Sequence, residues 1–235
     1  MEPAFFTLHA DLPREGPGCP EDVLWALSHV GWPERVIDAG CGPGADAETL
    51  AEALPQAQVT AIDAHPPFVA EAARRLARFG DRAKAEVGDM TALPGRADLI
   101  WSAGAVYIIG VERLLPLWRK VLRTGGKVVF SEGVLVSDAP SPEVRAFWGD
   151  FAPSSVEGLM ARVRSVGFEV HAARRIQGAA WEAYYAPMEA RIAALRKAGV
   201  TPEVEAALAE GEREIALWRA AKDEIAYLLL VVEPV

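Results

Sequence analysis

A glycine-rich loop with an acidic residue before it is the part of this chain best suited to chemistry. Arg35 to Asp38 has the pattern of a short buried strand, and Gly40, Gly42 and Gly44 follow at alternate positions. Glycines at this spacing let the backbone approach a ligand closely and adopt dihedral angles that a side chain forbids. Because an alanine-rich helical stretch comes next, the segment predicts a strand–loop–helix corner that binds a nucleotide.

The charge of Asp38 indicates which nucleotide suits the loop. Gly40-x-Gly42-x-x-Ala45 also fits a loose dinucleotide pattern, with Asp63 near the usual place of a ribose-binding acid. A pyrophosphate beside Asp38 would meet a carboxylate in a poorly screened crevice, where like charges about 4 Å apart repel by several kcal/mol. A ligand that carries a sulfonium and an ammonium group is attracted instead. S-adenosylmethionine is such a ligand.

Strand and helix patterns alternate after this corner, which predicts a parallel sheet with helices on both faces. We expect strands at 35–38, 58–62, 83–87, 97–101, 127–131, 168–176 and 224–232, and helices at 20–30, 45–54, 66–79, 111–122, 155–166 and 181–222, the last split near Gly199. The chain length suits one domain. We expect an arm or lid over 1–18, a cofactor-binding core over 19–135, and segments that cap the substrate at 136–153 and 178–222.

Asp38-x-Gly40-x-Gly42-x-Gly44 resembles the first motif of class I S-adenosylmethionine-dependent methyltransferases. The similarity continues at Asp63, at Gly88-Asp89-Met90, at the stretch 102–107 and at the turn around Gly125-Gly126. Within that family the chain is most similar to bacterial small-molecule methyltransferases of the ubiquinone/menaquinone-biosynthesis type. The resemblance implies a Rossmann-like, doubly wound α/β fold with a mostly parallel seven-stranded sheet. Its last strand is expected to be antiparallel and preceded by a helical insertion between strands six and seven.

The resemblance also implies a set of cofactor-binding residues. Asp38 is expected to meet the methionine ammonium, Asp63 the ribose hydroxyls and Asp89 the adenine. The full set is Asp38, Gly40, Cys41, Gly42, Gly44, Asp63, Ala64, Asp89, Met90 and Ser102. S-adenosylhomocysteine is the expected product.

Methyl transfer from a sulfonium is an in-line displacement with a good leaving group, so proximity and exclusion of water supply most of the catalysis. A base is needed only where the acceptor must lose a proton. Tyr107, Glu132 and His9 are the weak candidates for that base. We expect a small-molecule acceptor beside Trp101, Tyr107, Trp148, Trp181 and Tyr185.

Composition narrows the classes of partner. The net charge of −9 disfavours nucleic acid, because binding to phosphates needs clustered positive charge. No apolar run has the length of a membrane span, no signal peptide is recognisable, and the His and Cys residues lack metal-ligand spacing. We therefore expect a cytoplasmic monomer or homodimer without a metal. An NAD-dependent oxidoreductase, disfavoured by Asp38 and Pro43, and a non-catalytic S-adenosylmethionine-binding module remain the alternatives.

Overall fold

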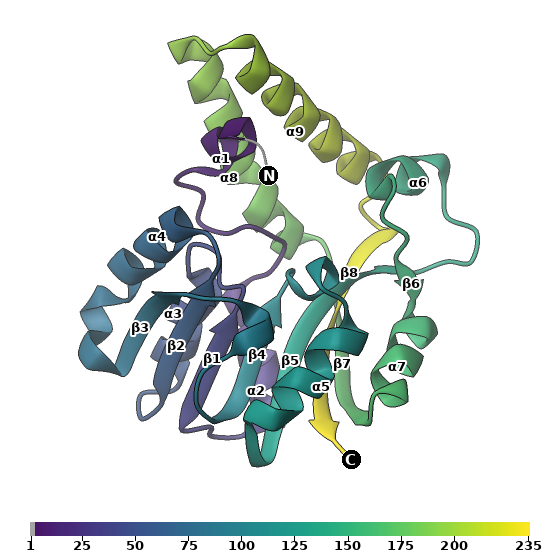
Figure 1. Cartoon of the computed structure of the whole chain (residues 1–235). Helices are drawn as coiled ribbons and strands as arrows, with labels where there is room; N and C mark the ends of the chain where they lie inside the picture. Colours follow the sequence, from purple (N-terminus) through teal and green to yellow (C-terminus); the bar gives the residue numbers. More distant parts are fainter. Residues whose placement is uncertain (1–2) are drawn as a thin grey trace.

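The chain forms one sheet with helices on both of its faces (Figure 1). The computed structural model describes residues 3–235, so the first two residues of the expected arm lie outside the described part. The strands are β1 (Arg35–Ala39), β2 (Gln58–Asp63), β3 (Ala83–Val87), β4 (Ala97–Ala103), β5 (Leu122–Leu135), β6 (Ser154–Ser155), β7 (Phe168–Ile176) and β8 (Ile225–Pro234). The helices are α1 (Pro3–His9), α2 (Pro20–Val30), α3 (Ala45–Ala53), α4 (Pro66–Leu76), α5 (Val111–Val121), α6 (Pro142–Trp148), α7 (Val156–Ser165), α8 (Ala179–Ala198) and α9 (Pro202–Ala220).

The strand order is β3-β2-β1-β4-β5-β8-β7, with the two-residue β6 paired to β5. Strands β1 to β5 pair in parallel, whereas β8 is antiparallel to both β5 and β7. Because α8 and α9 separate β7 from β8 in the chain, the expected antiparallel last strand and the helical insertion before it are both confirmed.

Alternate side chains of each central strand enter different cores. In β1, Val36 packs with α2 and α3 on one face, while Ile37 packs with α5 and α7 on the other. Leu99 and Ile100 divide in the same way on β4. This period of two, with apolar residues on both faces, is what a sheet covered on both sides requires.

Among the differences from the expected element boundaries, two affect a helix end and the length of a central strand. The helix expected over 66–79 ends at Leu76 and continues as a 3-10 turn, in which Gly80 has φ +61°. The strand expected at 127–131 is longer, because Leu122 already pairs with Ala97 before the register shifts to Leu99 and Lys127. The Gly125-Gly126 turn thus lies in an irregular stretch of β5, where the five steps from Leu122 to Lys127 face the two steps from Ala97 to Leu99 and Gly125 has φ +76°.

The amino-terminal arm and the α8–α9 pair lie above the carboxyl ends of the parallel strands (Figure 1). Helix α1 contacts both α8 and α9. The loop after it returns to the sheet, where Gly18 N donates to the carbonyl of Ala180 on α8 at 3.1 Å. The arm is therefore ordered and bridges the sheet and the two late helices.

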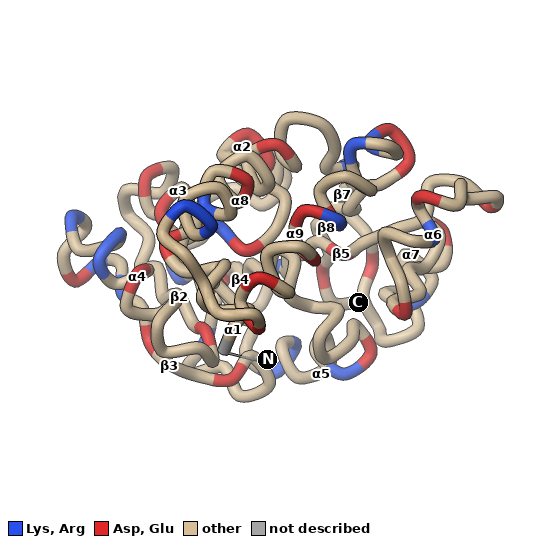
Figure 2. The backbone as a smooth tube through the Cα atoms, turned by 90° about the horizontal axis from the view of Figure 1, so that it is seen from above, with Lys and Arg blue, Asp and Glu red and all other residues tan. Residues whose placement is uncertain are grey.

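Acidic and basic residues are interspersed over the part of the chain that Figure 2 colours. Many basic side chains pair with acids, such as Arg75 with Glu48 and Arg219 with Glu189. Among the described helices, none is long and apolar enough to cross a membrane.

Candidate functional site

A cavity of about 550 Å³ opens at the carboxyl ends of β1, β2, β3 and β4. Parallel α/β sheets bind ligands at this edge, where loops and helix starts converge. The wall combines the glycine loop, the ends of β2 and β3, the turn after β4, and the arm. Of the expected cofactor-binding residues, those in the wall are Asp38, Gly40, Cys41, Gly42, Asp63, Ala64, Asp89 and Met90.

The glycine loop is held in place by backbone contacts that exclude a side chain. Gly40 N and Cys41 N both donate to the carbonyl of Ile62, at 2.8 and 3.0 Å. Gly40 has φ +74°, and a Cβ there would lie 2.7 Å from the Cβ of Ala105. Both the dihedral angle and the close approach therefore require glycine.

The three carboxylates differ in how much of their hydrogen-bonding capacity is used. Asp63 accepts from Gly42 N at 2.9 Å and from His65 N at 2.8 Å, which fixes its orientation at the end of β2. Asp89 is exposed, and one of its oxygens accepts from Thr91 N at 2.7 Å. Carboxylates fixed in this way keep lone pairs that can accept hydrogen bonds from the hydroxyl or amine groups of a ligand.

Asp38 is the unusual member of the set. It is 2% exposed, and its Oδ2 has no hydrogen-bond partner among the described residues. Burial, with repulsion from Asp46 and Asp63, raises the pKa of this carboxyl well above its usual range. A buried carboxylate with one oxygen left without a partner is costly, so a cation brought into the cavity would relieve this cost.

Two of the expected cofactor-binding residues do not line the cavity. Gly44 turns at φ +86° against α4, where a Cβ would lie 2.8 Å from the Cβ of Ala72, so it allows the loop to pack on that helix. Ser102 is fully buried and donates to the carbonyl of Ala39 at 2.7 Å, which ties β4 to β1. Both residues therefore hold the loop and the strands that form the cavity wall, without lining the cavity themselves.

The arm supplies wall residues that no motif in the sequence indicated. Phe6 stacks on His65 at 3.7 Å between ring centroids, and both rings line the cavity. Arg14 donates to the carbonyls of Gly16 and Gly18 and to Asp46 Oδ1, the last at 2.9 Å. This arginine thus fastens the arm to the start of α3.

The weak candidates for a base have different environments. Tyr107 lines the cavity and is 46% exposed, whereas His9 is buried and its Nδ1 lies 2.6 Å from Glu15 Oε2. Glu132 is 2% exposed and accepts from Arg162 Nη1 at 2.8 Å, away from the cavity wall. Glu132 pairs with Arg162 across β5 and α7, while its Oε2 is buried without a hydrogen-bond partner among the described residues, and its role as a base stays a prediction.

Most of the residues expected in the acceptor pocket do not line the cavity. Trp101 is buried and donates to Asp46 Oδ2 at 3.1 Å, and Trp181 is buried and donates to the carbonyl of Ile176 at 3.0 Å. Tyr185 packs against Trp181 and Trp218, and Trp148 stacks with Tyr227 at 6.2 Å. Among the five residues expected in the pocket, Tyr107 alone lines the cavity.

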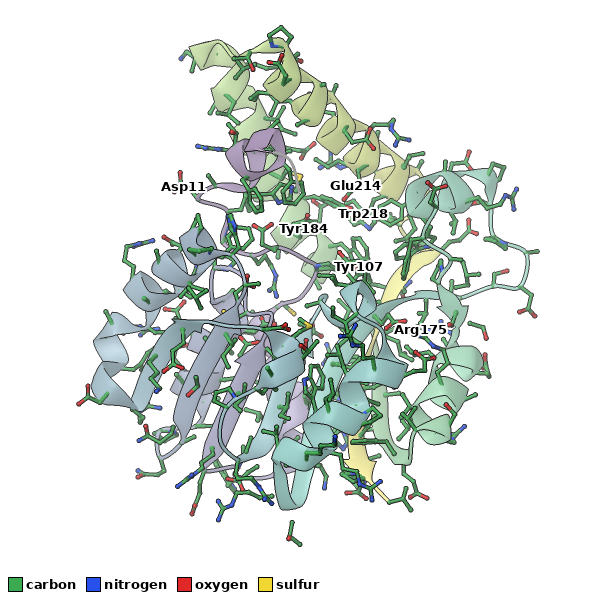
Figure 3. All side chains as sticks on the ribbon, viewed as in Figure 1. Asp11, Tyr107, Arg175, Tyr184, Glu214 and Trp218 are labelled. Atoms are coloured by element: carbon green, nitrogen blue, oxygen red, sulfur yellow. The ribbon has the colours of Figure 1, made fainter. Side chains whose placement is uncertain are left out.

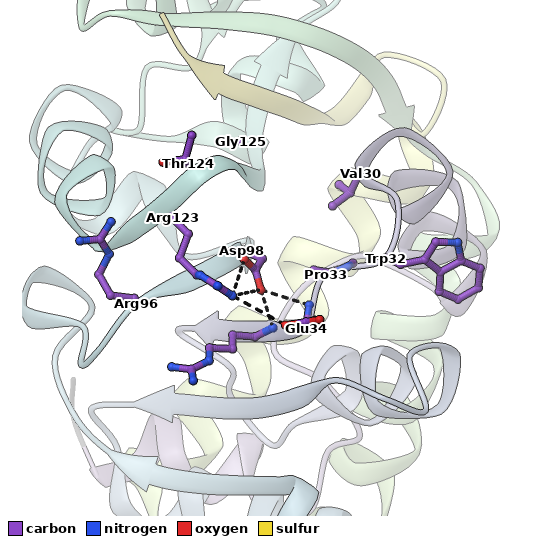
Figure 4. Close-up of a pocket in the computed structure, with 10 residues that line it drawn as sticks. Val30, Trp32, Pro33, Glu34, Arg96, Asp98, Arg123, Thr124 and Gly125 are labelled. Atoms are coloured by element: carbon purple, nitrogen blue, oxygen red, sulfur yellow. Dashed lines mark hydrogen bonds and ion pairs between the residues drawn. The ribbon is translucent and has the colours of Figure 1, made fainter.

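A second hollow, of about 690 Å³, lies at the opposite edge of the sheet (Figure 4). There Asp98 accepts from Glu34 N at 3.1 Å, from Arg35 N at 2.9 Å and from Arg123 Nη1 at 3.2 Å. These hydrogen bonds use the Asp98 carboxylate to connect the amino ends of β1 and β4 to β5. Although larger, this hollow lies at the amino ends of the strands, away from the glycine loop, and we assign it no ligand.

Comparison with known proteins supports the interpretation of this edge. A family described as a methyltransferase domain matches residues 36–126. A structure of an S-adenosylmethionine-dependent methyltransferase from Geobacter sulfurreducens, in complex with S-adenosyl-L-homocysteine, superimposes with a TM-score of 0.87 at 20% identity and covers 100% of this chain and 99% of that one. The chain has the fold of these methyltransferases. The [4+2]-cyclase SpnF shares the fold too, with a TM-score of 0.73 at 20% identity over 92% of this chain and 81% of its own.

The curated relatives match only in part. The malonyl-[acyl-carrier protein] O-methyltransferase of Pseudescherichia vulneris is 33% identical over 60% of this chain and 52% of its own length. The trans-aconitate 2-methyltransferase of Methylobacterium nodulans is 33% identical over 46% of this chain and 41% of its own. The chain therefore spans about half the length of these relatives or less. Among the described residues, no group of three or more His, Cys, Asp or Glu could hold a metal ion.

Proposed function

We propose that this protein transfers the methyl group of S-adenosylmethionine to a small molecule. The observation that carries the proposal is the buried Asp38 carboxyl, unpartnered at Oδ2, in the wall of a cavity behind a glycine loop. The methionine ammonium would supply the missing partner, Asp63 would accept from the ribose hydroxyls, and Asp89 would accept from the adenine amine. The ubiquinone/menaquinone type stays a prediction, since the two named relatives act on other acceptors.

The chemistry asked of the protein is alignment and exclusion of water. The nucleophile attacks the methyl carbon as the carbon–sulfur bond breaks, and the electron pair moves to sulfur. The arm, through Phe6 and the contacts of Arg14, would cover the bound cofactor and keep water away from the sulfonium.

Two alternative functions lead to different expectations for ligand binding or turnover. A dinucleotide would bring phosphates toward Asp38 and Asp63, which already repel each other's charge. A protein that binds S-adenosylmethionine without transferring methyl groups would keep the same wall. The cyclase with this fold shows that the fold does not determine the reaction.

Calorimetry with S-adenosylmethionine, S-adenosylhomocysteine and NADH separates the first two possibilities. We expect a dissociation constant in the micromolar range for both adenosyl ligands and no heat with NADH. Asp63→Ala and Gly42→Val should each abolish binding, because one removes the ribose acceptor and the other places a side chain at φ +52° in the loop. Asp98→Asn at the opposite edge of the sheet is the control and should bind normally. Binding of NADH alone would overturn the proposal.

A further inference from the structure

A cluster of phenols around one carboxylate lies next to the cavity, under the α8–α9 pair. We call Tyr107, Tyr184, Tyr185, Glu214 and Tyr227 the phenol–carboxylate cluster. Figure 3 shows Tyr184 and Glu214, from α8 and α9, in the region between these helices and Tyr107 at the sheet edge. The cluster belongs to neither the glycine loop nor the three aspartates.

Two contacts connect this cluster to the cavity. Tyr107 is itself a wall residue, and Gly104, also in the wall, has the Tyr227 ring 3.6 Å from where its Cβ would be. Tyr227 and Glu214 remain partly accessible although they lie between packed elements, as side chains beside a hollow do. The cluster therefore adjoins the cavity at the turn after β4.

Glu214 is the carboxyl group of this region. It accepts from the Tyr185 hydroxyl at 2.8 Å, and burial raises the pKa of its carboxyl while Tyr185, His9 and Arg213 oppose that shift. His9 is paired with Glu15, which lines the cavity. Arg213 follows Glu210 on α9 and pairs with it in an exposed position.

The cations near the cavity are already engaged. Arg14 is the single Lys or Arg in the wall among the described residues, and its side chain is bonded to Asp46 and to two carbonyls of the arm. An anionic acceptor would thus meet Glu15 and Glu214 without a free counter-charge.

Aromatic rings lie near the Glu214 carboxyl group, and within the cluster Tyr107 is the ring that lines the cavity. Tyr184 and Tyr185 lie 4.9 Å apart between centroids, Tyr185 lies 5.1 Å from Trp218, and Tyr107 lies 5.6 Å from Phe151. The negative face of an aromatic ring attracts a cation, and rings grouped with a carboxylate are a common way to recognise ammonium groups. The same arrangement offers little to a carboxylate ligand.

From this arrangement we propose that the methyl acceptor is a small amine, held as a cation by Glu214 and the surrounding aromatic rings. The inference rests on the proposed methyl transfer and names its substrate class. The bound ammonium passes one proton to the Glu214 carboxylate. The freed nitrogen lone pair then attacks the methyl carbon, the carbon–sulfur bond breaks, and S-adenosylhomocysteine and a methylammonium product form.

This acceptor differs from those of the named relatives, which are methyltransferases of malonyl-acyl-carrier protein and trans-aconitate. A malonyl or aconitate group carries carboxylates and calls for a cationic or strongly donating pocket. The phenol–carboxylate cluster has the opposite charge. The acceptor side of this chain is therefore specialised for a different chemistry, above a cofactor side that matches the methyltransferase domain.

The test compares choline with its neutral isostere 3,3-dimethylbutan-1-ol on protein saturated with S-adenosylhomocysteine. The two ligands have nearly the same shape and differ in charge, so their affinity ratio isolates recognition of the cation. We expect choline to bind at least ten-fold more tightly by calorimetry. Equal affinities, tighter binding of the neutral alcohol, or no binding of either would overturn the amine proposal. Failure of S-adenosylhomocysteine to bind would instead overturn the proposed function.

Variants on α9 locate the effect. Glu214→Gln can still accept from Tyr185 but has no charge, and it should reduce the preference for choline to less than three-fold while S-adenosylhomocysteine binds as before. Glu212 lies on α9 like Glu214, at an exposed site paired with Arg196 of α8. Glu212→Gln is therefore the matched control and should keep the preference. An unchanged ratio in Glu214→Gln would contradict the assignment. In turnover assays with S-adenosylmethionine, small primary amines should accept methyl groups. Phenols and carboxylic acids of similar size should not.

Discussion

At Asp38 the needs of ligand binding oppose those of stability. The side chain is buried beside Asp46 and Asp63, and both raise its pKa in addition to the effect of burial. In the ligand-free protein, the charged form of this carboxyl is an unfavourable element of the fold. Once an ammonium group is bound, the same charge becomes favourable. Residues with this conflict are frequent in binding sites.

We predict that Asp38→Asn stabilises the ligand-free protein and weakens cofactor binding. The amide has nearly the same shape and no charge, so unfolding free energy should rise by about 1–3 kcal/mol at neutral pH. Affinity for S-adenosylhomocysteine should fall at least ten-fold, because the ammonium loses its counter-charge. Denaturant unfolding and calorimetry measure the two effects. A variant that binds normally would show that Asp38 does not hold the ammonium.

The sign of the pH dependence follows from the raised pKa. At pH values above the unfolded pKa of about 3.9, the unfolded chain releases the Asp38 proton while the folded protein still holds it. The stability that this residue contributes is therefore complete below that value and is lost as pH rises through the folded pKa. The stability gap between Asp38→Asn and the natural chain should widen as pH increases above about 4. A constant gap between pH 4 and 8 would show that the charge carries no cost.

Among the elements, the arm is the one whose role was hardest to predict. The proline- and glycine-rich composition of residues 1–18 is compatible with a lid or with a flexible arm, since it lacks a periodic apolar pattern. Its order comes from distant partners. Arg75 on α4 donates to the carbonyl of Pro13 at 3.3 Å, and Arg191 on α8 donates to the carbonyl of Thr7 at 3.2 Å. Contacts over such separations leave no local signal.

Arg14→Gln should loosen the arm and weaken cofactor binding by about ten-fold, equivalent to about 1.4 kcal/mol. The variant loses the ion pair to Asp46 and the guanidinium hydrogen bonds to the carbonyls of Gly16 and Gly18. Amide hydrogen exchange over residues 3–18 should accelerate. Arg74→Gln removes an exposed arginine paired with Glu71 on α4 and should change neither measurement. Slow exchange in the arm of Arg14→Gln would contradict this role.

The strand ends were predictable because their signals are local. Asp38 and Asp63 lie at the carboxyl ends of β1 and β2, and Asp89 follows β3 by two residues. Parallel strands bring such ends to one edge of a sheet. The side chains that the arm, α8 and α9 bring near the cavity were not predictable from local signals. Glu15, Tyr184 and Glu214 come from three segments whose own patterns show only a loop and two amphipathic helices. The helical period also could not tell that Trp181, Tyr184 and Tyr185 all pack into the core and that none of them lines the cavity.

In the whole molecule, the cavity lies where three separately supported parts meet. The sheet provides the aspartates and the glycine loop, the arm provides Phe6 and Glu15, and the turn after β4 provides Tyr107. The α8–α9 pair adds Glu214 above them and contacts the arm through α1. A ligand that fills the cavity would therefore contact the sheet, the arm and the turn after β4 at once.

This arrangement predicts that S-adenosylhomocysteine stabilises the entire fold. At a free concentration one hundred times its dissociation constant, a ligand specific for the folded state adds about 2.7 kcal/mol. For a chain of this size, that corresponds to a rise of roughly 5–10 °C in the unfolding midpoint. Adenosine alone should give a smaller rise, because it reaches Asp63 and Asp89 but leaves Asp38 unpaired. Differential scanning calorimetry measures both shifts, with Asp63→Ala as the variant expected to show neither. Equal shifts for adenosine and S-adenosylhomocysteine would show that the ammonium and Asp38 contribute nothing to binding.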